Sequence, residues 1–163
     1  MTTRDGCETG LHLSLYQSMR LPHYIYRTND SFLDYEFISE GPRGNIKKVV
    51  RFSQISANAF DLAFGDLDEK TGDISDTVVT NNDDSRKVLA TVAATVYDFS
   101  FQYPGVWIVA KGRTHSRNRL YRMGISNNWQ EINTEFEVYG LINEEWKLFE
   151  AGKDYDAFLV RRK

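Results

Sequence analysis

The sequence has few of the residues that build disulfide frameworks and zinc sites. It contains one cysteine, Cys7, and three histidines among 163 residues. A single cysteine excludes an intramolecular disulfide and every zinc site that needs two or more thiolates. This cysteine content is typical of a reducing compartment, so we expect a cytoplasmic protein.

Long apolar runs and an excess of positive charge are also missing. No stretch approaches the roughly 18 apolar residues of a membrane-spanning helix, and the first ten residues lack the apolar core of a signal peptide. The formal net charge of −3 excludes a strong overall attraction to nucleic acid or to anionic lipid. We therefore expect no membrane partner.

What is present fits one ordinary globular domain. Hydrophobic residues make up 41% of the chain and charged residues 26%. Residues 1–20 are polar and carry no strong periodicity, so we expect a mobile N-terminal extension followed by a single domain over residues 21–163.

Hydrophobic periodicity predicts an α+β fold. Apolar runs or alternation predict strands at 24–27, 32–38, 46–52, 60–64, 106–110, 137–142, 146–149 and 157–161, with a weaker candidate at 76–80. A helical stripe containing Val88, Val92 and Val96 predicts a helix that starts at 83–85 and ends before Pro104. A second helix begins near residue 114 or 116, with a kink at 127–128.

The order β-β-β-(β)-α-β-α-β-β predicts two helices packed on one mixed, mainly antiparallel sheet. The run at 106–110 is continuously apolar, which favours a central strand buried on both faces. We therefore expect Trp107 to be mostly buried.

The segment 111–122 carries the strongest functional signal. It holds five lysines and arginines, and no acidic residue occurs between Asp98 and Glu131. Its order is strand, glycine turn and helix start, and a helix N-terminus attracts anions. The predicted ligand-binding residues are Gly112, Arg113, Thr114, Ser116, Arg117, Arg119 and Arg122. The segment is not a P-loop, because it lacks Gly-Lys-Ser/Thr.

The alternative without a ligand is that these arginines pair with the acidic loop or lie on a solvated helix face. One of them, Arg119, is expected to be structural and to hold Glu36 or Asp61 of the sheet. The acidic stretch from 61 to 84 contains eight acids against Lys70 alone. Within it, Asp66 and Asp68 are candidate ligands for Mg²⁺ or Ca²⁺, with a solvated loop as the alternative.

A third candidate surface combines Lys47, Lys48 and Arg51 with Tyr35 and Phe37. Basic and aromatic side chains on a sheet face bind single-stranded nucleic acid by stacking, although both aromatic residues fit the core equally well. Searches for nucleophile and metal-histidine motifs find none, and the adjacency of His115 and Ser116 makes no catalytic pair.

Three stretches together resemble a known family. They are 37–52 (FISEGPRGNIKKVVRF), the run DLAFGD at 61–66 leading to NNDDSRKVLATV at 81–92, and the pattern G-x-T-x-S-R-x-R-L-Y-R at 112–122. The chain resembles small uncharacterised bacterial proteins, mainly from Bacteroidota, over about residues 23–163. The resemblance implies a stand-alone cytoplasmic protein and carries over no catalytic residue.

The leading hypothesis is a cytoplasmic binding domain for an anionic, phosphate-containing ligand, either a nucleotide or nucleic acid. The first alternative is a metal-dependent, nuclease-like hydrolase of a toxin or phage-defence type, which would use Asp66, Asp68 and Arg117. The second is a protein-interaction module with an acidic loop. Exposed Trp129, Tyr139 or Trp146 would favour a homodimer.

Overall fold

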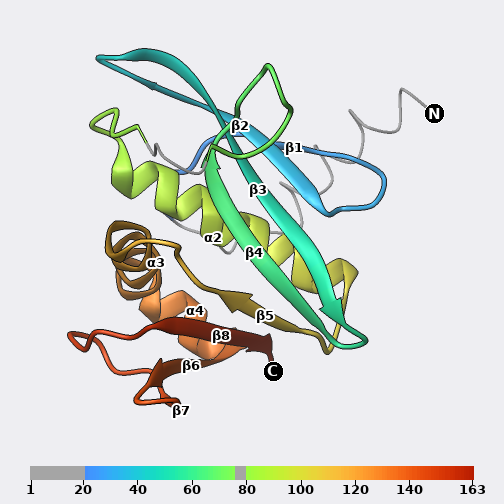
Figure 1. Ribbon diagram of the computed structural model, residues 1–163, viewed down its shortest axis with the longest axis vertical. Coiled ribbons are helices and arrows are strands. Elements are labelled where there is room, and N and C mark those ends of the chain that lie inside the picture. The colour runs from blue at the N-terminus through green and yellow to red at the C-terminus, as the bar shows by residue number, and fades with distance from the viewer. Residues whose placement is uncertain (1–20, 76–79) are drawn as a thin grey trace.

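The computed structural model describes residues 21–75 and 80–163 (Figure 1). The expected mobile extension at 1–20 therefore lies outside the described residues, as do residues 76–79 of the weak strand candidate. No helix within the described part of the chain is long and apolar enough to cross a membrane.

In the part of the chain that the structure describes, eight strands form one sheet in the order β1-β2-β3-β4-β5-β8-β6-β7. Among these described strands only β4 and β5 pair in parallel, and every other neighbouring pair is antiparallel. The predicted α+β class and the mixed, mainly antiparallel sheet are confirmed. The strands are β1 Arg27–Thr28, β2 Asp34–Gly41, β3 Gly44–Ser56, β4 Ala59–Asp66, β5 Trp107–Ala110, β6 Phe136–Ile142, β7 Glu145–Leu148 and β8 Ala157–Arg162.

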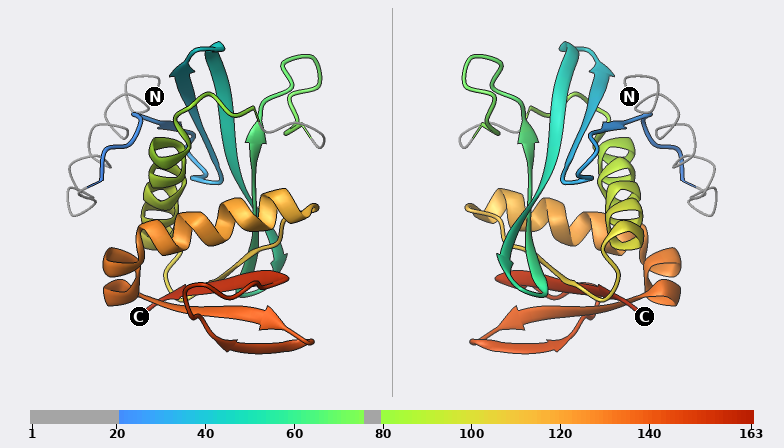
Figure 2. Two further views of the ribbon diagram at one scale, coloured as in Figure 1. Left: turned by 90° about the vertical axis from the view of Figure 1, so that its left-hand side faces the viewer. Right: turned by 90° about the vertical axis from the view of Figure 1, so that its right-hand side faces the viewer.

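The helices are α2 Ser85–Gln102, α3 His115–Asn127 and α4 Trp129–Glu135, and they lie on one side of the sheet (Figure 2). The second predicted helix is thus two helices, separated at the kink expected from the sequence. Asn128 lies between them with a non-helical backbone (φ −110°, ψ 16°), and its backbone N–H and its side-chain amide both donate to the Gly124 carbonyl, at 3.3 Å and 2.7 Å.

The core lies between the helices and the inner face of the sheet. Phe52 of β3 stacks on Phe99 of α2 with ring centroids 4.0 Å apart. Tyr35 and Phe37 are 0% and 2% exposed, so they belong to this core. The nucleic-acid interpretation of that strand surface is therefore wrong, because its aromatic rings face the helices and cannot meet a base.

Within residues 21–75 and 80–163 no helix covers the other face of the sheet, which corrects the expectation for Trp107. Strand β5 is central in the sheet order, as predicted, but its residues are alternately buried and half-buried. Trp107 is half-buried on the open face, where the Arg161 guanidinium lies 4.1 Å from its ring centroid. The continuous apolar run did not reveal that one face is open.

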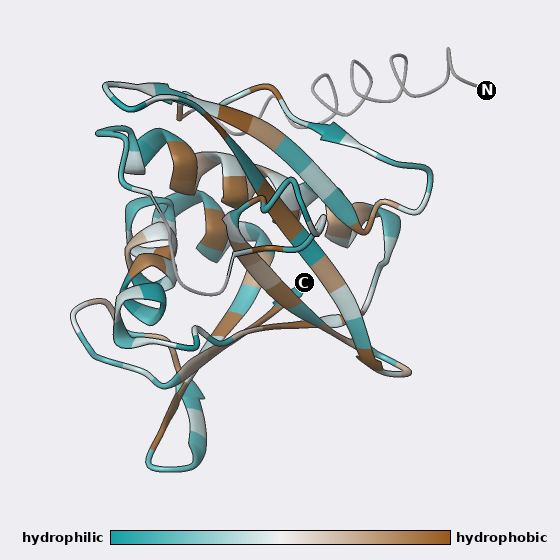
Figure 3. Ribbon diagram, turned by 45° about the horizontal axis from the view of Figure 1, so that its top comes forward, coloured by the Kyte–Doolittle hydropathy of each residue, from teal (hydrophilic) through white to brown (hydrophobic). Residues whose placement is uncertain are grey.

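Of the three aromatic residues considered for a dimer contact, only Trp146 is exposed, at 43%. Trp129 packs on Phe149, and Tyr139 lies edge-on to Trp107. Figure 3 shows hydrophobic residues concentrated along the long strands and the inner turns of the helices, while the loop that follows β4 is largely hydrophilic.

The parallel pair β4–β5 determines where a site forms. Parallel neighbours end at the same edge of a sheet, and each of these two strands leads into a helix. Helix α2 follows β4 and helix α3 follows β5. The N-termini of both helices are thereby placed at one edge, which is the position where ligands bind in open α/β sheets.

Candidate functional site

A cleft of about 680 Å³ opens at this edge, between the loop before α2 and the two helices. Its lining comes from β3, β4, α2 and α3. Segment 111–122 supplies five of the lining residues, Thr114, Ser116, Arg117, Arg119 and Leu120. The predicted segment therefore contributes a wall of the cleft at the carboxyl ends of β4 and β5.

Arg117 lies in the first turn of α3 and is 9% exposed. Its Nη2 donates to the Ser75 carbonyl oxygen at 2.5 Å. No carboxylate among the described residues lies within ion-pair distance of its guanidinium. A buried cation without a counter-ion is unfavourable, so an anion in the cleft would offset the cost of burying Arg117.

The start of α3 adds to this positive potential. Thr114 is the N-cap, as predicted, and its hydroxyl accepts from the Arg117 backbone N–H at 3.2 Å. The first helical backbone bond runs from Asn118 to Thr114. The amides of residues 115 and 116 precede it, and the first turn contains no acidic residue. The helix dipole here is thus uncompensated by sequence.

Gly112 has a packing role. Its N–H donates to the Asn118 side-chain oxygen at 2.6 Å, and a Cβ at this position would lie 2.5 Å from the Asn118 backbone nitrogen. The glycine lets the chain after β5 pass close to the first turn of α3. It positions Arg117, and its own amide is already bonded.

The remaining arginines of segment 111–122 have different surroundings. Arg119 is exposed at the cleft and makes no ion pair with any acid in 21–75 or 80–163. The expectation that Arg119 holds Glu36 or Asp61 is therefore wrong. Arg122 makes an ion pair with Asp154, and it lies outside the cleft lining.

Arg113 is exposed and near Asp61. Burial raises the pKa of Asp61, and the positive charge of Arg113 opposes that rise. Arg117 acts similarly on Tyr121, whose pKa burial raises to about 12 while the guanidinium opposes the shift.

Lys48 and Asp66 form a buried ion pair at the floor of the cleft. Lys48 is 1% exposed, and its Nζ donates to Asp66 Oδ1 at 2.5 Å and to the Thr80 carbonyl at 2.9 Å. The other Asp66 oxygen accepts from the Thr80 hydroxyl at 2.6 Å and from its N–H at 3.1 Å. These bonds tie β3 and β4 to the loop before α2.

This arrangement bears on the proposed metal ligands. Asp66 is occupied by Lys48 and Thr80, and Asp68 accepts from the Lys70 N–H at 3.0 Å. In the part of the chain that the structure describes, no group of three or more His, Cys, Asp or Glu residues is placed to hold a metal ion. The Mg²⁺ or Ca²⁺ hypothesis gains no support from these residues.

The family model described as "Family of unknown function (DUF6934)" matches residues 20–163. The chain belongs to this family. The match confirms the resemblance to uncharacterised proteins that the sequence indicated. No curated protein and no solved structure matches the chain.

In this DUF6934 domain the acidic loop after β4 is partnered mainly by β3. Arg51 donates to Asp34 at 2.7 Å and lies 3.8 Å from Asp73, and Lys47 lies 3.9 Å from Glu69. Toward Arg117 the described part of the loop offers a carbonyl oxygen and no carboxylate. The loop acids named here therefore pair with Arg51 and Lys47 of β3, which lie outside segment 111–122.

Sequence reasoning missed the contribution of Lys48, Thr80 and the start of α2 to the cleft of the DUF6934 domain. Asp84, the residue before α2, also lines it, but its Oδ2 accepts from the Tyr24 and Ser39 hydroxyls at 2.7 Å and 2.5 Å. The sequence does show two successive strand-to-helix junctions, β4 to α2 and β5 to α3. These junctions predict one shared site only when β4 and β5 are known to pair in parallel.

Proposed function

We propose that the cleft binds a phosphate-containing anion and that this domain is a cytoplasmic binding module. The observation that carries the proposal is Arg117, a cation that is nine-tenths buried, lines the cleft and has no carboxylate partner among the described residues. A dianionic phosphate would supply the missing counter-charge.

The groups around Arg117 suit a phosphate. The amides of residues 115 and 116 and the Ser116 hydroxyl are donors at the helix start. Arg119 adds a second guanidinium, and planar guanidinium groups match phosphate oxygens in a bidentate geometry. All of these groups belong to the first turns of one helix, so the site is rigid before a ligand arrives.

The hydrolase alternative has weaker support. It needs Asp66 and Asp68 as metal ligands, and Asp66 is already bonded to Lys48 and Thr80. Binding requires no change in these contacts.

The test is thermal unfolding with inorganic phosphate against chloride at equal ionic strength. Phosphate should raise the melting temperature, because a ligand that binds only the folded state stabilises it by about 2.7 kcal/mol at a hundred times its Kd. Phosphate also stabilises proteins through exclusion from their surface, so variants are needed as controls.

The site-specific part of the shift should vanish in Arg117→Ala and shrink in Arg119→Ala, which removes an exposed side chain and leaves the core intact. Arg122→Ala is the matched control, since it lies on the same helix outside the cleft. Equal phosphate shifts in the wild type, Arg117→Ala and Arg119→Ala would overturn the proposal.

A further inference from the structure

The cleft has an apolar side next to its cationic end. Arg117, Leu120 and Met123 follow one another at three-residue spacing along α3, and all three line the cleft. Residues at this spacing share one face of a helix. Leu120 and Met123 are half-buried, so their side chains remain accessible from the cleft.

Helix α2 provides the opposite part of this apolar side. Val88 and Leu89, both buried, line the cleft from the first two turns of α2. Phe64 of β4 closes the floor between the two helices. From Arg117 to Met123 the helix rises about 9 Å. A ligand whose charge sits at Arg117 thus has room for an apolar body of about that length along α3.

The rim of the cleft is acidic, which selects against a continuous polyanion. Asp83 is exposed beside the cleft-lining residue Asp84. The loop that starts after Asp66, and whose Ser75 carbonyl oxygen accepts a hydrogen bond from Arg117, carries exposed Asp68 and Glu69. A nucleic-acid strand would bring further phosphates against these carboxylates, whereas a terminal phosphate brings its charge only to Arg117.

We propose, building on the proposed anion site, that its ligand is a small phosphate monoester of the nucleoside monophosphate class, in which the flat face of the base serves as the apolar body. The phosphate contacts Arg117, Arg119 and the start of α3. The apolar body lies against Leu120 and Met123. One molecule binds per chain.

Calorimetric titration of the full chain with AMP, inorganic phosphate, adenosine and a ten-nucleotide single strand tests this at fixed salt. AMP should bind at least about tenfold more tightly than inorganic phosphate, since apolar burial adds to the same phosphate contacts. Adenosine should bind far more weakly than AMP. The oligonucleotide should bind no more tightly than AMP.

Two variants test whether the apolar side of the cleft gives AMP its higher affinity. Met123→Gln keeps the helix and places a polar group on the apolar side, so it should remove most of the AMP advantage while the Kd for inorganic phosphate stays the same. Leu148→Gln changes a leucine that is 69% exposed on β7, far from the cleft lining, and should change neither Kd.

Each other outcome is decisive. Equal affinities for AMP and phosphate, or an AMP advantage that survives Met123→Gln, would overturn the monoester while leaving the anion site intact. Tighter binding of the oligonucleotide would assign the site to nucleic acid. Failure of both phosphate and AMP to bind would overturn the monoester and the proposed function together.

Discussion

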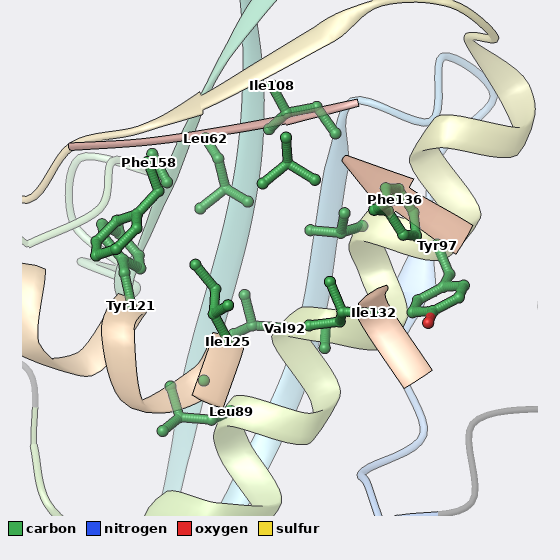
Figure 4. Close-up of a pocket in the computed structure, with 15 residues that line it drawn as sticks. Leu62, Leu89, Val92, Tyr97, Ile108, Tyr121, Ile125, Ile132, Phe136 and Phe158 are labelled. Atoms are coloured by element: carbon green, nitrogen blue, oxygen red, sulfur yellow. The ribbon is translucent and has the colours of Figure 1, made fainter. Parts of the chain in front are cut away.

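Two hollows lie side by side in this fold and share the side chain of Leu89. The cleft at the carboxyl ends of β4 and β5 has a volume of about 680 Å³ and converging cations and hydroxyls. The second hollow, of about 70 Å³, lies between the helices and the sheet (Figure 4). Figure 4 shows Leu62, Ile125 and Phe158 facing this common space, with apolar side chains around it.

The difference between the hollows comes from which part of each helix lines them. Within an apolar stripe a helix presents only methyl groups and rings, so a gap left there is a packing defect that stays dry. At its first turn a helix presents unpaired N–H groups and, in α3, two cations. A binding site is indicated by convergent donors with an unbalanced charge, and of these two hollows the polar one has them.

The largest effect is expected from breaking the ion pair that forms the floor of the polar hollow. Asp66→Ala leaves the Lys48 ammonium buried without a counter-ion and should destabilise the fold by about 3–5 kcal/mol. The double variant Lys48→Met/Asp66→Leu should recover much of that loss. Urea denaturation measures both, and a loss below about 1 kcal/mol in Asp66→Ala would contradict the assignment of a buried pair.

Arg117→Met sharpens the contrast between a paired and an unpaired buried cation. In phosphate-free buffer it should change stability far less than Asp66→Ala does, because no buried carboxylate loses its partner. With phosphate added, only the wild type should gain stability. A loss as large as that of Asp66→Ala would mean that Arg117 already has a counter-ion in the ligand-free protein.

The next largest effect tests whether a buried charge alone marks a site. Asp98 of α2 is fully buried, lines neither hollow, and has its pKa raised to about 7 by burial, an effect that hydrogen bonds from Gln102 and Tyr26 partly oppose. Because its folded pKa exceeds its unfolded value near 3.8, the folded state binds more protons between those values. Stability should therefore fall as pH rises from about 4 to 7, on the order of 4 kcal/mol for this group.

The variant Asp98→Asn should flatten this part of the pH profile and should be more stable than the wild type at pH 8. Urea midpoints at pH 5 and pH 8 measure the change. Phosphate binding should be unaffected. An unchanged pH slope in the variant would show that other groups cause it.

The smallest effect concerns the apolar hollow. Gly124 lines it in the middle of α3, and a Cβ there would lie 3.4 Å from Leu89 Cδ2, in ordinary contact. Gly124→Ala should raise stability by about 1 kcal/mol, since alanine is the better helix former and fills space. Gly44→Ala is the contrasting control: its φ of +89° is unfavourable for alanine, so stability should fall. A loss in Gly124→Ala would mean that the hollow cannot accept a methyl group.

The periodic parts of the fold were readable from the sequence. The valine stripe of α2 lies where the pattern predicted it, since local spacing determines it. What failed depended on distant partners. The Lys48–Asp66 pair joins residues on different strands, and nothing near Trp107 indicates that one face of the sheet is open.

Segment 111–122 shows the same limit within the candidate site. Its cationic character and helix start were predicted, but the roles of its arginines depend on which side of α3 faces the cleft. Arg117 and Arg122 are five residues apart, which turns them about 140° from each other around the helix. Only the packing of α3 against α2 decides that Arg117 enters the cleft and that Arg122 reaches Asp154.

The single parallel pairing has a consequence for how the domain folds. In the sheet order of the described strands, β4–β5 is the junction between the first four strands and the last four. The antiparallel hairpins β2–β3, β3–β4 and β6–β7 close over short loops. In contrast, the segment that connects β4 to β5 contains the whole of α2. Such non-local pairing is slow, so the two halves dock late. The cleft exists only after that step, and a bound anion would act as a clamp that slows their separation, visible as reduced hydrogen exchange along β5.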